Sequence, residues 1–150
     1  MENLGEKIVE IAMAEIGTKE NPINSNKTKY GEWFGWNGVM WCGIFVSYCY
    51  FLAGKPLRGY GWLKGFAGCQ QTVSLMRKKK LEVLEPQEGD IVFFDWEGDG
   101  RYDHTGIFVR KLNDLEFESI EGNTSINNQS NGGEVMLRRR KFKQSTFFRP

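Results

Sequence analysis

The spacing of apolar residues changes near the middle of the chain, and this change constrains the fold more than any other feature of the sequence. In the first half, Leu4, Ile8 and Ile11 recur at helical spacing, which predicts a helix over residues 3–16 that stops at Gly17. In the second half, short apolar runs alternate with clusters of Gly, Asp and Asn, as is typical of strands joined by turns. Helices followed by strands indicate an α+β architecture.

Two further helices are predicted before the strands begin. The run from Cys42 to about Ala53 is almost continuously apolar, and Gly54 and Pro56 follow it, which favours a buried helix over a strand. Another helix is predicted over residues 68–80. The polar and aromatic segment that precedes the central helix is expected to be irregular, with one short helical turn.

The second half contains the runs GDIVFFDW, DHTGIFVRK, LEFESIEGN, GGEVMLRRRKF and TFFRP, which predict consecutive strands. Such strands form a largely antiparallel sheet, and we expect the N-terminal helices, the central one above all, to pack on it. The sequence has no internal repeat and no linker, so residues 1–150 are predicted to form a single domain.

Composition narrows the functional class. A chain of 150 residues can build a core without disulfides. Three cysteines is an odd count, so at least one thiol stays free, and reduced cysteines suit synthesis in the cytoplasm. The charged N-terminus predicts neither a signal peptide nor membrane insertion. A net charge of +1 argues against nucleic-acid binding, and we expect a monomer. The basic runs 77–80 and 138–141 are interpreted as solvated faces of a helix and a strand, with weak attraction to an anionic polymer as the alternative.

Cys42 and Cys49 share the predicted central helix but cannot form a disulfide there. Their Cα atoms would be ~10.5 Å apart at a rise of ~1.5 Å per residue, whereas a disulfide tolerates at most ~7 Å. A zinc site is disfavoured because the chain has one histidine and no CxxC motif. Cys49 and the isolated Cys69 are interpreted as core residues, since free cysteine packs as a small hydrophobe.

Cys42 differs because it lies at the predicted start of the helix. Unpaired N–H groups and the helix dipole favour negative charge there, which lowers the pKa of a thiol and makes the nucleophilic thiolate available. The same N–H groups could receive a developing oxyanion. A reactive thiol is therefore an alternative to a core residue at this position.

A thiolate catalyst needs a proton acceptor and donor, and His104 is the only histidine. It lies at the start of a predicted strand. The next predicted strand ends with Glu121 and Asn123, which the two-residue period of a strand places on one face, within reach of the imidazole if the two strands pair. Separately, a lone histidine and a polar pair at a strand end are more often incidental surface or core residues.

Taken together, WCGIFVSY, GDIVFFDW with DHTGIFV, and SIEGN resemble the CHAP domain, the cysteine- and histidine-dependent amidohydrolase/peptidase family of the papain-like superfamily that also contains NlpC/P60 enzymes. The resemblance implies a papain-like fold with the nucleophile at the N-terminus of the central helix. It implies that Cys42 is the nucleophile and His104 the general base and acid. Glu121 would orient the histidine, and Asn123 would support the same polar network.

The same resemblance implies hydrolysis of a peptidoglycan amide bond, in the peptide stem, the cross-bridge or the muramoyl-alanine link, through an acyl-enzyme and without a required cofactor. Many members are phage endolysins or autolysins, so action at the cell wall after phage- or lysis-mediated release is expected. Members often carry a wall-binding module, and we expect this chain to be a bare catalytic domain or a piece of a longer protein.

Some relatives bind calcium through an Asp-rich loop before the cysteine, but no aspartate occurs in NSNKTKYGEWFGWNG. Instead, Asp95, Glu97 and Asp99 in DWEGDG resemble the opening of an EF-hand loop, although Gly106 stands where the closing Glu belongs. A bound cation at these residues and a simple acidic hairpin turn are the two interpretations.

Five tryptophans fall mostly in predicted loops. Trp36, Trp41 and Trp96 are the candidates to line a substrate cleft, with core packing as the alternative. Two other functions remain open. The chain could be a non-catalytic wall- or partner-binding module, or a papain-like amidase that acts on a different amide. NlpC/P60 relatives commonly use a second histidine, which this chain lacks.

Overall fold

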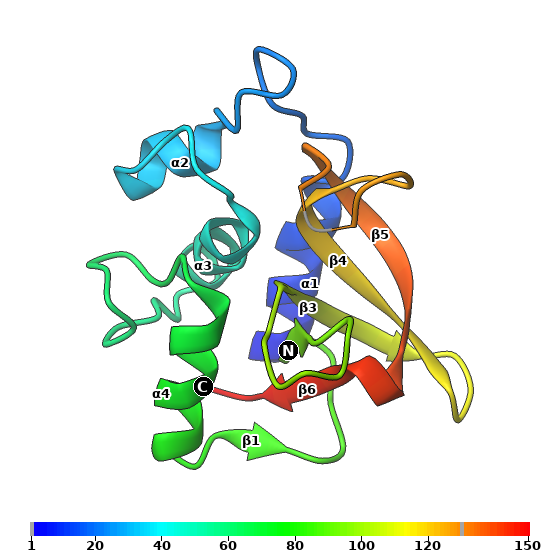
Figure 1. The fold of residues 1–150 in the computed structure, drawn as a ribbon. Coiled ribbons are helices and arrows are strands. Elements are labelled where there is room, and N and C mark those ends of the chain that lie inside the picture. The colour runs from blue at the N-terminus through cyan, green and yellow to red at the C-terminus, as the bar shows by residue number, and fades with distance from the viewer. Residues whose placement is uncertain (1, 130) are drawn as a thin grey trace.

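In the computed structural model, which describes residues 2–129 and 131–150, helices precede a sheet, and the predicted α+β class is confirmed (Figure 1). The helices are α1 (Leu4–Ala14), α2 (Lys29–Phe34), α3 (Cys42–Leu52) and α4 (Cys69–Lys78). The strands are β1 (Glu82–Val83), β2 (Ile91–Phe94), β3 (His104–Lys111), β4 (Glu116–Thr124), β5 (Glu134–Lys141) and β6 (Ser145–Phe148), with a 3-10 helix η1 (Phe142–Gln144) before β6.

The strands form one sheet in the order β1-β6-β2-β3-β4-β5, and every neighbouring pair is antiparallel. The C-terminal strand β6 returns to the far side of the sheet and lies between β1 and β2. Strand β1 was not predicted, because two residues are too few to show a periodicity. The other five strands and the three longer helices lie where the hydrophobic pattern placed them, within a few residues at each end.

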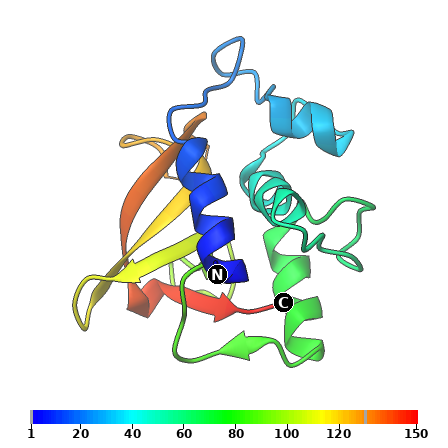
Figure 2. The same ribbon diagram turned by 180° about the vertical axis from the view of Figure 1, so that it is seen from behind.

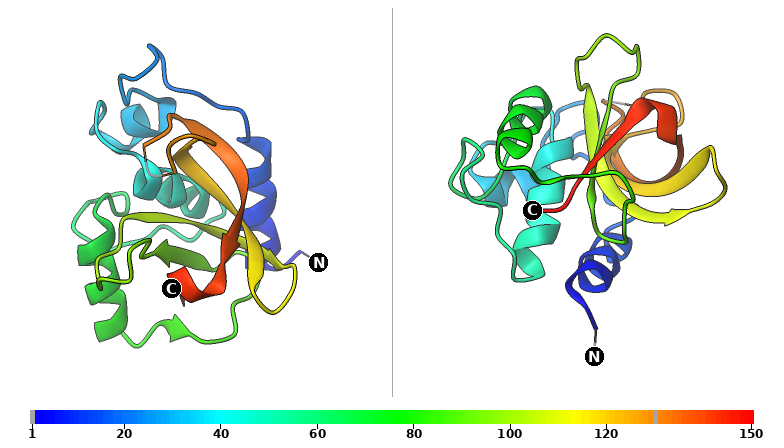
Figure 3. Two further views of the ribbon diagram at one scale, coloured as in Figure 1. Left: turned by 45° about the vertical axis from the view of Figure 1, so that its right-hand side comes forward. Right: turned by 90° about the horizontal axis from the view of Figure 1, so that it is seen from below.

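Alternate residues of the strands enter two different cores. On β2, Ile91 and Phe93 face the helices and belong to the main core, whereas Val92 and Phe94 face the opposite side. There they pack with Phe108, Phe117 and Phe147. The sheet is strongly curled, as the view from below shows (Figure 3). Both faces are buried, so β2 shows no apolar–polar alternation in its sequence.

Helix α3 packs against β3 and β4 on the face that α1 also covers (Figure 2). Gly122 in β4 permits this close approach. A Cβ atom at Gly122 would lie 2.7 Å from Cβ of Phe45 and 2.8 Å from Cζ3 of Trp41. Because glycine lacks that atom, the start of α3 can lie against the strand that carries Glu121. No helix of the described residues is long and apolar enough to cross a membrane.

Candidate active site

Cys42 is the first residue of α3 and is 5% exposed. No side chain caps this end of the helix, so its N–H groups remain available to a negative charge. The preceding residue, Trp41, is fully buried; its indole N–H donates to Oε2 of Glu20 at 3.0 Å and its ring stacks on Tyr30. The prediction that Trp41 lines a substrate cleft is therefore wrong, because this side chain anchors the start of α3 in the core.

His104 is the first residue of β3 and its side chain is fully buried. Its Nε2–H donates to Oε1 of Glu121 on the neighbouring strand β4, at 3.0 Å. Gly106 makes room for this contact, because a Cβ atom there would lie 2.6 Å from Cγ of Glu121. The structure thus brings together the histidine and the carboxylate that the strand pattern proposed as partners.

The Glu121 carboxylate is held from its other side by Arg140 of β5. Nε of Arg140 donates to Oε2 at 2.8 Å and Nη2 donates to Oε1 at 2.6 Å, a bidentate pair in the interior. The hydroxyl of Ser119 also donates to Oε2. The guanidinium of Arg140 lies 4.8 Å from the ring centroid of Trp96, which adds a cation–π contact.

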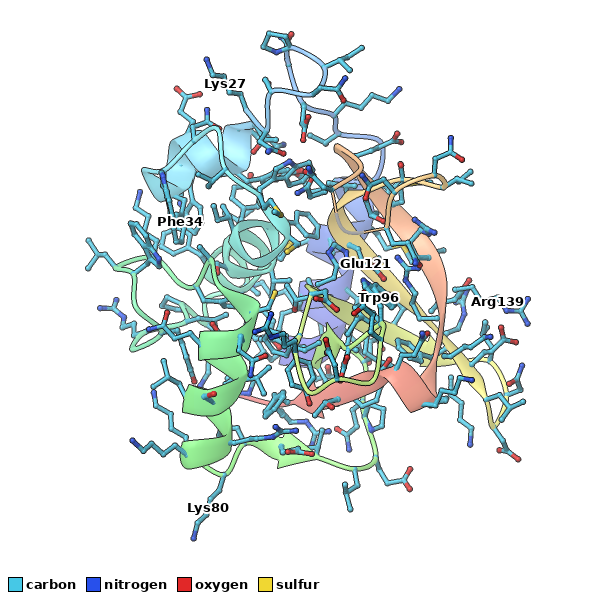
Figure 4. All side chains as sticks on the ribbon, in the orientation of Figure 1. Lys27, Phe34, Lys80, Trp96, Glu121 and Arg139 are labelled. Atoms are coloured by element: carbon cyan, nitrogen blue, oxygen red, sulfur yellow. The ribbon has the colours of Figure 1, made fainter. Side chains whose placement is uncertain are left out.

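Arg140 is only 5% exposed, which corrects the interpretation of residues 138–141 as a solvated face. The two-residue period of β5 sends Arg140 inward to Glu121 and Arg139 outward, where it pairs with Glu116 at the surface. In Figure 4, Glu121 and Trp96 lie near the middle of the view and Arg139 lies at its edge. The alternation within RRRK was the signal that sequence reasoning did not use.

The remaining ring nitrogen of His104, Nδ1, has no hydrogen-bond partner among the described residues. It is the nitrogen left for Cys42, and the two groups shift each other's pKa. Burial by itself lowers the pKa of His104, but Cys42 and then Glu121 outweigh it and raise the pKa to about 9. Glu121 in turn is ionised: burial raises its pKa, but Arg140 and His104 lower it to about 2.

The thiol of Cys69 is the second group that acts on Cys42. The two Sγ atoms are 4.0 Å apart, and the hydrogen bond from Cys69 is the largest cause that lowers the pKa of Cys42 well below its ordinary value. Burial opposes this effect, and His104 adds to it. These shifts favour a Cys42 thiolate beside a His104 imidazolium, with an ionised Glu121 carboxylate behind the ring.

The other two cysteines differ from each other. Cys49 is fully buried, and burial raises the pKa of its thiol well above the ordinary value, as expected for the core residue that was predicted. Cys69 is half-buried and packs against the main core, as expected, but its sulfur also touches that of Cys42. Sequence spacing gave no sign of this contact, because 27 positions separate the two residues.

Asn123 is buried, but it does not join the network around His104. The pairing of β4 with β5 shifts register between Glu121 and Thr124, and Asn123 has a positive φ of 56°. Its Oδ1 accepts from the N–H of Gly133 at 3.2 Å, and its Nδ2 has no partner among the described residues. The regular alternation that placed Asn123 beside Glu121 fails at this irregularity.

The two remaining tryptophan candidates lie in different surroundings. Trp36 is 41% exposed and stacks on Trp62, with ring centroids 4.7 Å apart, at a cavity of about 500 Å³ that is also lined by Met40 and Gly68. These two residues lie close in sequence to Cys42 and Cys69. Trp96 stacks on Phe94 and lies beside His104, 6.2 Å between ring centroids.

The DWEGDG loop forms a turn that holds its own carboxylate. Oδ1 of Asp95 accepts from the N–H groups of Gly98 and Asp99, and Oδ2 accepts from that of Gly100 at 2.8 Å. These bonds hold the Asp95 carboxylate within the acidic turn. Among the described residues, no group of three or more His, Cys, Asp or Glu side chains is placed to hold a metal ion.

Comparison with known proteins identifies the family of this chain. The family model of the CHAP domain matches residues 33–123, which include Cys42, His104 and Glu121. A Bacillus subtilis (strain 168) protein named "Uncharacterized protein YhbB" is 30% identical over 92 residues. That match covers 47% of this chain and 29% of the relative, so the chain spans less than a third of that protein's length. The chain belongs to the CHAP domain family.

Proposed function

We propose that this chain is a peptidoglycan hydrolase that cleaves an amide bond, with Cys42 as the nucleophile. CHAP domains are generally cysteine- and histidine-dependent amidohydrolases or peptidases, and the family suggests a peptidoglycan substrate. The observation that carries the proposal is the buried series Cys42, His104, Glu121 and Arg140, in which each group sets the charge of the next.

In the first step, the Cys42 thiolate attacks the carbonyl carbon of the amide. The negative charge that develops on the carbonyl oxygen is received by N–H groups at the uncapped start of α3. The His104 imidazolium gives a proton to the leaving amine from Nδ1, and an acyl-enzyme on the Cys42 sulfur remains.

In the second step, neutral His104 takes a proton from water, and the oxygen of that water attacks the acyl carbon. The C–S bond to Cys42 breaks, the carboxylic acid product leaves, and the Cys42 thiolate and the His104 imidazolium are restored. Glu121 supports both steps, because its hydrogen bond to Nε2 fixes the orientation of the ring and keeps Nδ1 directed to the reacting atoms. Arg140 keeps Glu121 ionised at every pH at which the enzyme would act. The hydrogen bond to Glu121 and the packing of Trp96 thus hold His104 in place.

The cavity beside Trp36 and Trp62 is the proposed place for the sugar or peptide part of the substrate. Its apolar aromatic wall offers a surface for stacking. Met40, which also lines the cavity, lies two positions before Cys42 in the sequence. A larger cavity of about 580 Å³ is lined by Asp114, Leu115 and Phe142 among others, none of which lies close in sequence to Cys42 or Cys69, whereas Met40 and Gly68 line the first cavity. We place the substrate in the first cavity for this reason.

The proposal is tested by comparing the chain with its Cys42→Ala variant on a suspension of purified bacterial cell walls. The variant should lose clearing activity and keep its circular dichroism spectrum and melting temperature. Mass spectrometry of the released fragments would distinguish an amidase, which frees the muramoyl-alanine link, from an endopeptidase, which cuts the stem or the cross-bridge. Equal clearing by the variant would refute the proposed nucleophile.

A binding module without chemistry makes a different prediction for the thiols. If Cys42 is not activated, iodoacetamide at pH ~6.5 should label it no faster than Cys49. Selective labelling of Cys42 without release of fragments from cell walls would instead indicate a cysteine amidase that acts on another amide.

A further inference from the structure

The sulfur atoms of Cys42 and Cys69 touch, although the residues come from different helices. Cys42 is the first residue of α3 and Cys69 is the first residue of α4. Their Sγ atoms are 4.0 Å apart, which is a direct contact with no room for a third atom between them. Both thiols are free. The proposed mechanism needs only one of these sulfurs, so the presence of the second calls for an explanation.

We propose that Cys69 resolves oxidation of Cys42: when a hydroperoxide oxidises the Cys42 sulfur, Cys69 forms a reversible disulfide with it. The S–S bond of a disulfide is ~2.05 Å long, so the two sulfurs have to approach each other by about 2 Å. Cys69 is half-buried in the first turn of its helix, and the space around the preceding Gly68 is open. The start of α4 therefore has room for the small adjustment that closes the bond.

The chemistry consists of two balanced displacements. The Cys42 thiolate attacks one oxygen of hydrogen peroxide, the O–O bond breaks, and hydroxide leaves and takes up a proton as water, which makes a sulfenic acid on Cys42. The sulfur of Cys69, having lost its proton, then attacks the Cys42 sulfur. The S–O bond breaks, and the hydroxide that leaves becomes the second water. Two thiols and one peroxide give one disulfide and two waters.

Electrostatics favours this order of events. In the reduced site the hydrogen bond with Cys42, burial and the negative charge on Cys42 raise the pKa of Cys69 well above its ordinary value. Cys42 is therefore the thiolate that peroxide meets first. Its conversion to a neutral sulfenic acid removes the negative charge beside Cys69. Cys69 can then lose its proton more easily, at the moment when its thiolate is needed.

Cys49 cannot form a disulfide with Cys42 and therefore serves as a matched control. It lies on α3 with Cys42, but two turns further along, where a helix places it ~10.5 Å away. It is fully buried and packs in the main core. A general sensitivity of thiols to peroxide would affect all three cysteines, whereas the proposed disulfide involves only Cys42 and Cys69.

The consequence for activity rests on the proposed function of Cys42 as the nucleophile. A disulfide at Cys42 would switch hydrolysis off while protecting the sulfur from further oxidation to sulfinic acid, which a thiol reductant does not reverse. A dithiol reductant would restore the thiolate. Without Cys69, the sulfenic acid would persist and proceed to the irreversible product when peroxide is in excess.

The experiment treats the wild type, Cys69→Ser, Cys69→Ala and Cys49→Ala with excess hydrogen peroxide, and then with dithiothreitol. Non-reducing peptide mapping follows the sulfur chemistry, and cell-wall clearing follows activity relative to each reduced variant. Wild type and Cys49→Ala should yield a linked peptide of Cys42 with Cys69 and recover about nine-tenths of their activity. Both Cys69 variants should gain two oxygen atoms on Cys42 and recover about a tenth or less.

The inference is overturned if the wild type yields no linked peptide and accumulates sulfinic acid on Cys42 as fast as the Cys69 variants. The mapping needs no catalysis, so it separates the two proposals. A linked peptide in a protein whose reduced form does not clear walls would support the disulfide and contradict the hydrolase. Thermal melts of the two Cys69 variants check that both variants are folded.

Discussion

Two arginine–carboxylate pairs of this protein have the same geometry in different surroundings. Arg140 holds Glu121 through two hydrogen bonds of 2.8 and 2.6 Å, and Arg149 holds Asp90 through two of 2.8 Å. Both carboxylates are buried. The arginines differ, because the side chain of Arg140 is 4% exposed and that of Arg149 is 42% exposed.

The two carboxylates differ in the group that they bind besides the arginine, and this difference separates the roles of the two pairs. Asp90 accepts from the backbone N–H of Gln87 and lies just before β2, while Arg149 follows β6, so this pair ties two neighbouring strands together at their ends. Glu121 accepts instead from the imidazole of His104, which lies beside Cys42. The same ion pair therefore stabilises the fold in one place and, in our proposal, sets up an acid–base group in the other.

The largest expected effect comes from neutralising each carboxylate. Glu121→Gln should lower the rate of cell-wall clearing by about 10²- to 10⁴-fold, because the amide no longer stabilises the His104 imidazolium or fixes its orientation. Asp90→Asn should leave the clearing rate unchanged and lower the melting temperature. Clearing assays and thermal melts of the two variants test this contrast. Equal loss of activity in both would show that the pairs act only through stability.

The second contrast removes the arginines. Arg140→Met leaves a buried carboxylate without its counter-ion and should lower the free energy of unfolding by about 3–5 kcal/mol. Arg149→Met should cost about 1–2 kcal/mol, because water can reach the half-exposed site.

Urea unfolding followed by fluorescence measures both values. If Arg140→Met does not fold, Arg140→Lys keeps the charge but loses the bidentate geometry and takes its place. A cost for Arg149→Met that equals or exceeds that for the Arg140 variant would contradict the difference in burial.

The smallest effect is a pH dependence that belongs to the Glu121 pair. The pKa of Glu121 is about 2 in the folded chain, below its ordinary 4.5, so its contribution to stability is present above pH 4.5 and is lost as pH falls toward 2. His104 has the opposite sign: its pKa is raised from 6.5 to about 9, so its contribution is complete below pH 6.5 and is lost as pH rises through 9.

Urea unfolding at several pH values should show that wild type loses more stability than Glu121→Gln between pH 4.5 and 2, since the variant lacks the group that titrates. The clearing rate of wild type should also fall above pH 9, where the imidazolium loses its proton. A pH profile of stability that is the same in both proteins would show that Glu121 is not ionised in the folded state.

Much of the site could be predicted from local patterns. An apolar run that begins at Cys42 and ends before glycine and proline is enough to indicate a buried helix with a cysteine at its start. Consecutive strands separated by turn residues are enough to place His104 and Glu121 on neighbours of an antiparallel sheet. These inferences need only the spacing of side chains along one element and the order of elements.

The predictions failed where a side chain's environment depends on residues from elsewhere in the chain. Trp41 was predicted to line the substrate cleft, yet its indole N–H donates to Glu20 inside the core, and Glu20 lies 21 positions earlier in the chain. Arg140 was predicted to lie on a solvated face, although the two-residue period of the strand also allowed the inward position that it takes. Asn123 was placed by a regular alternation that a register shift and a positive φ interrupt.

By itself, the sequence determined the fold class, the order of the elements and the candidates Cys42, His104 and Glu121, because hydrophobic period and turn residues act over a few positions. Only the tertiary structure decided that Cys69 touches Cys42 and that Arg140 closes the network behind Glu121. These contacts span 27 and 19 positions of the chain. They exist because helix packing and strand register bring distant side chains together, and no local pattern encodes that distance.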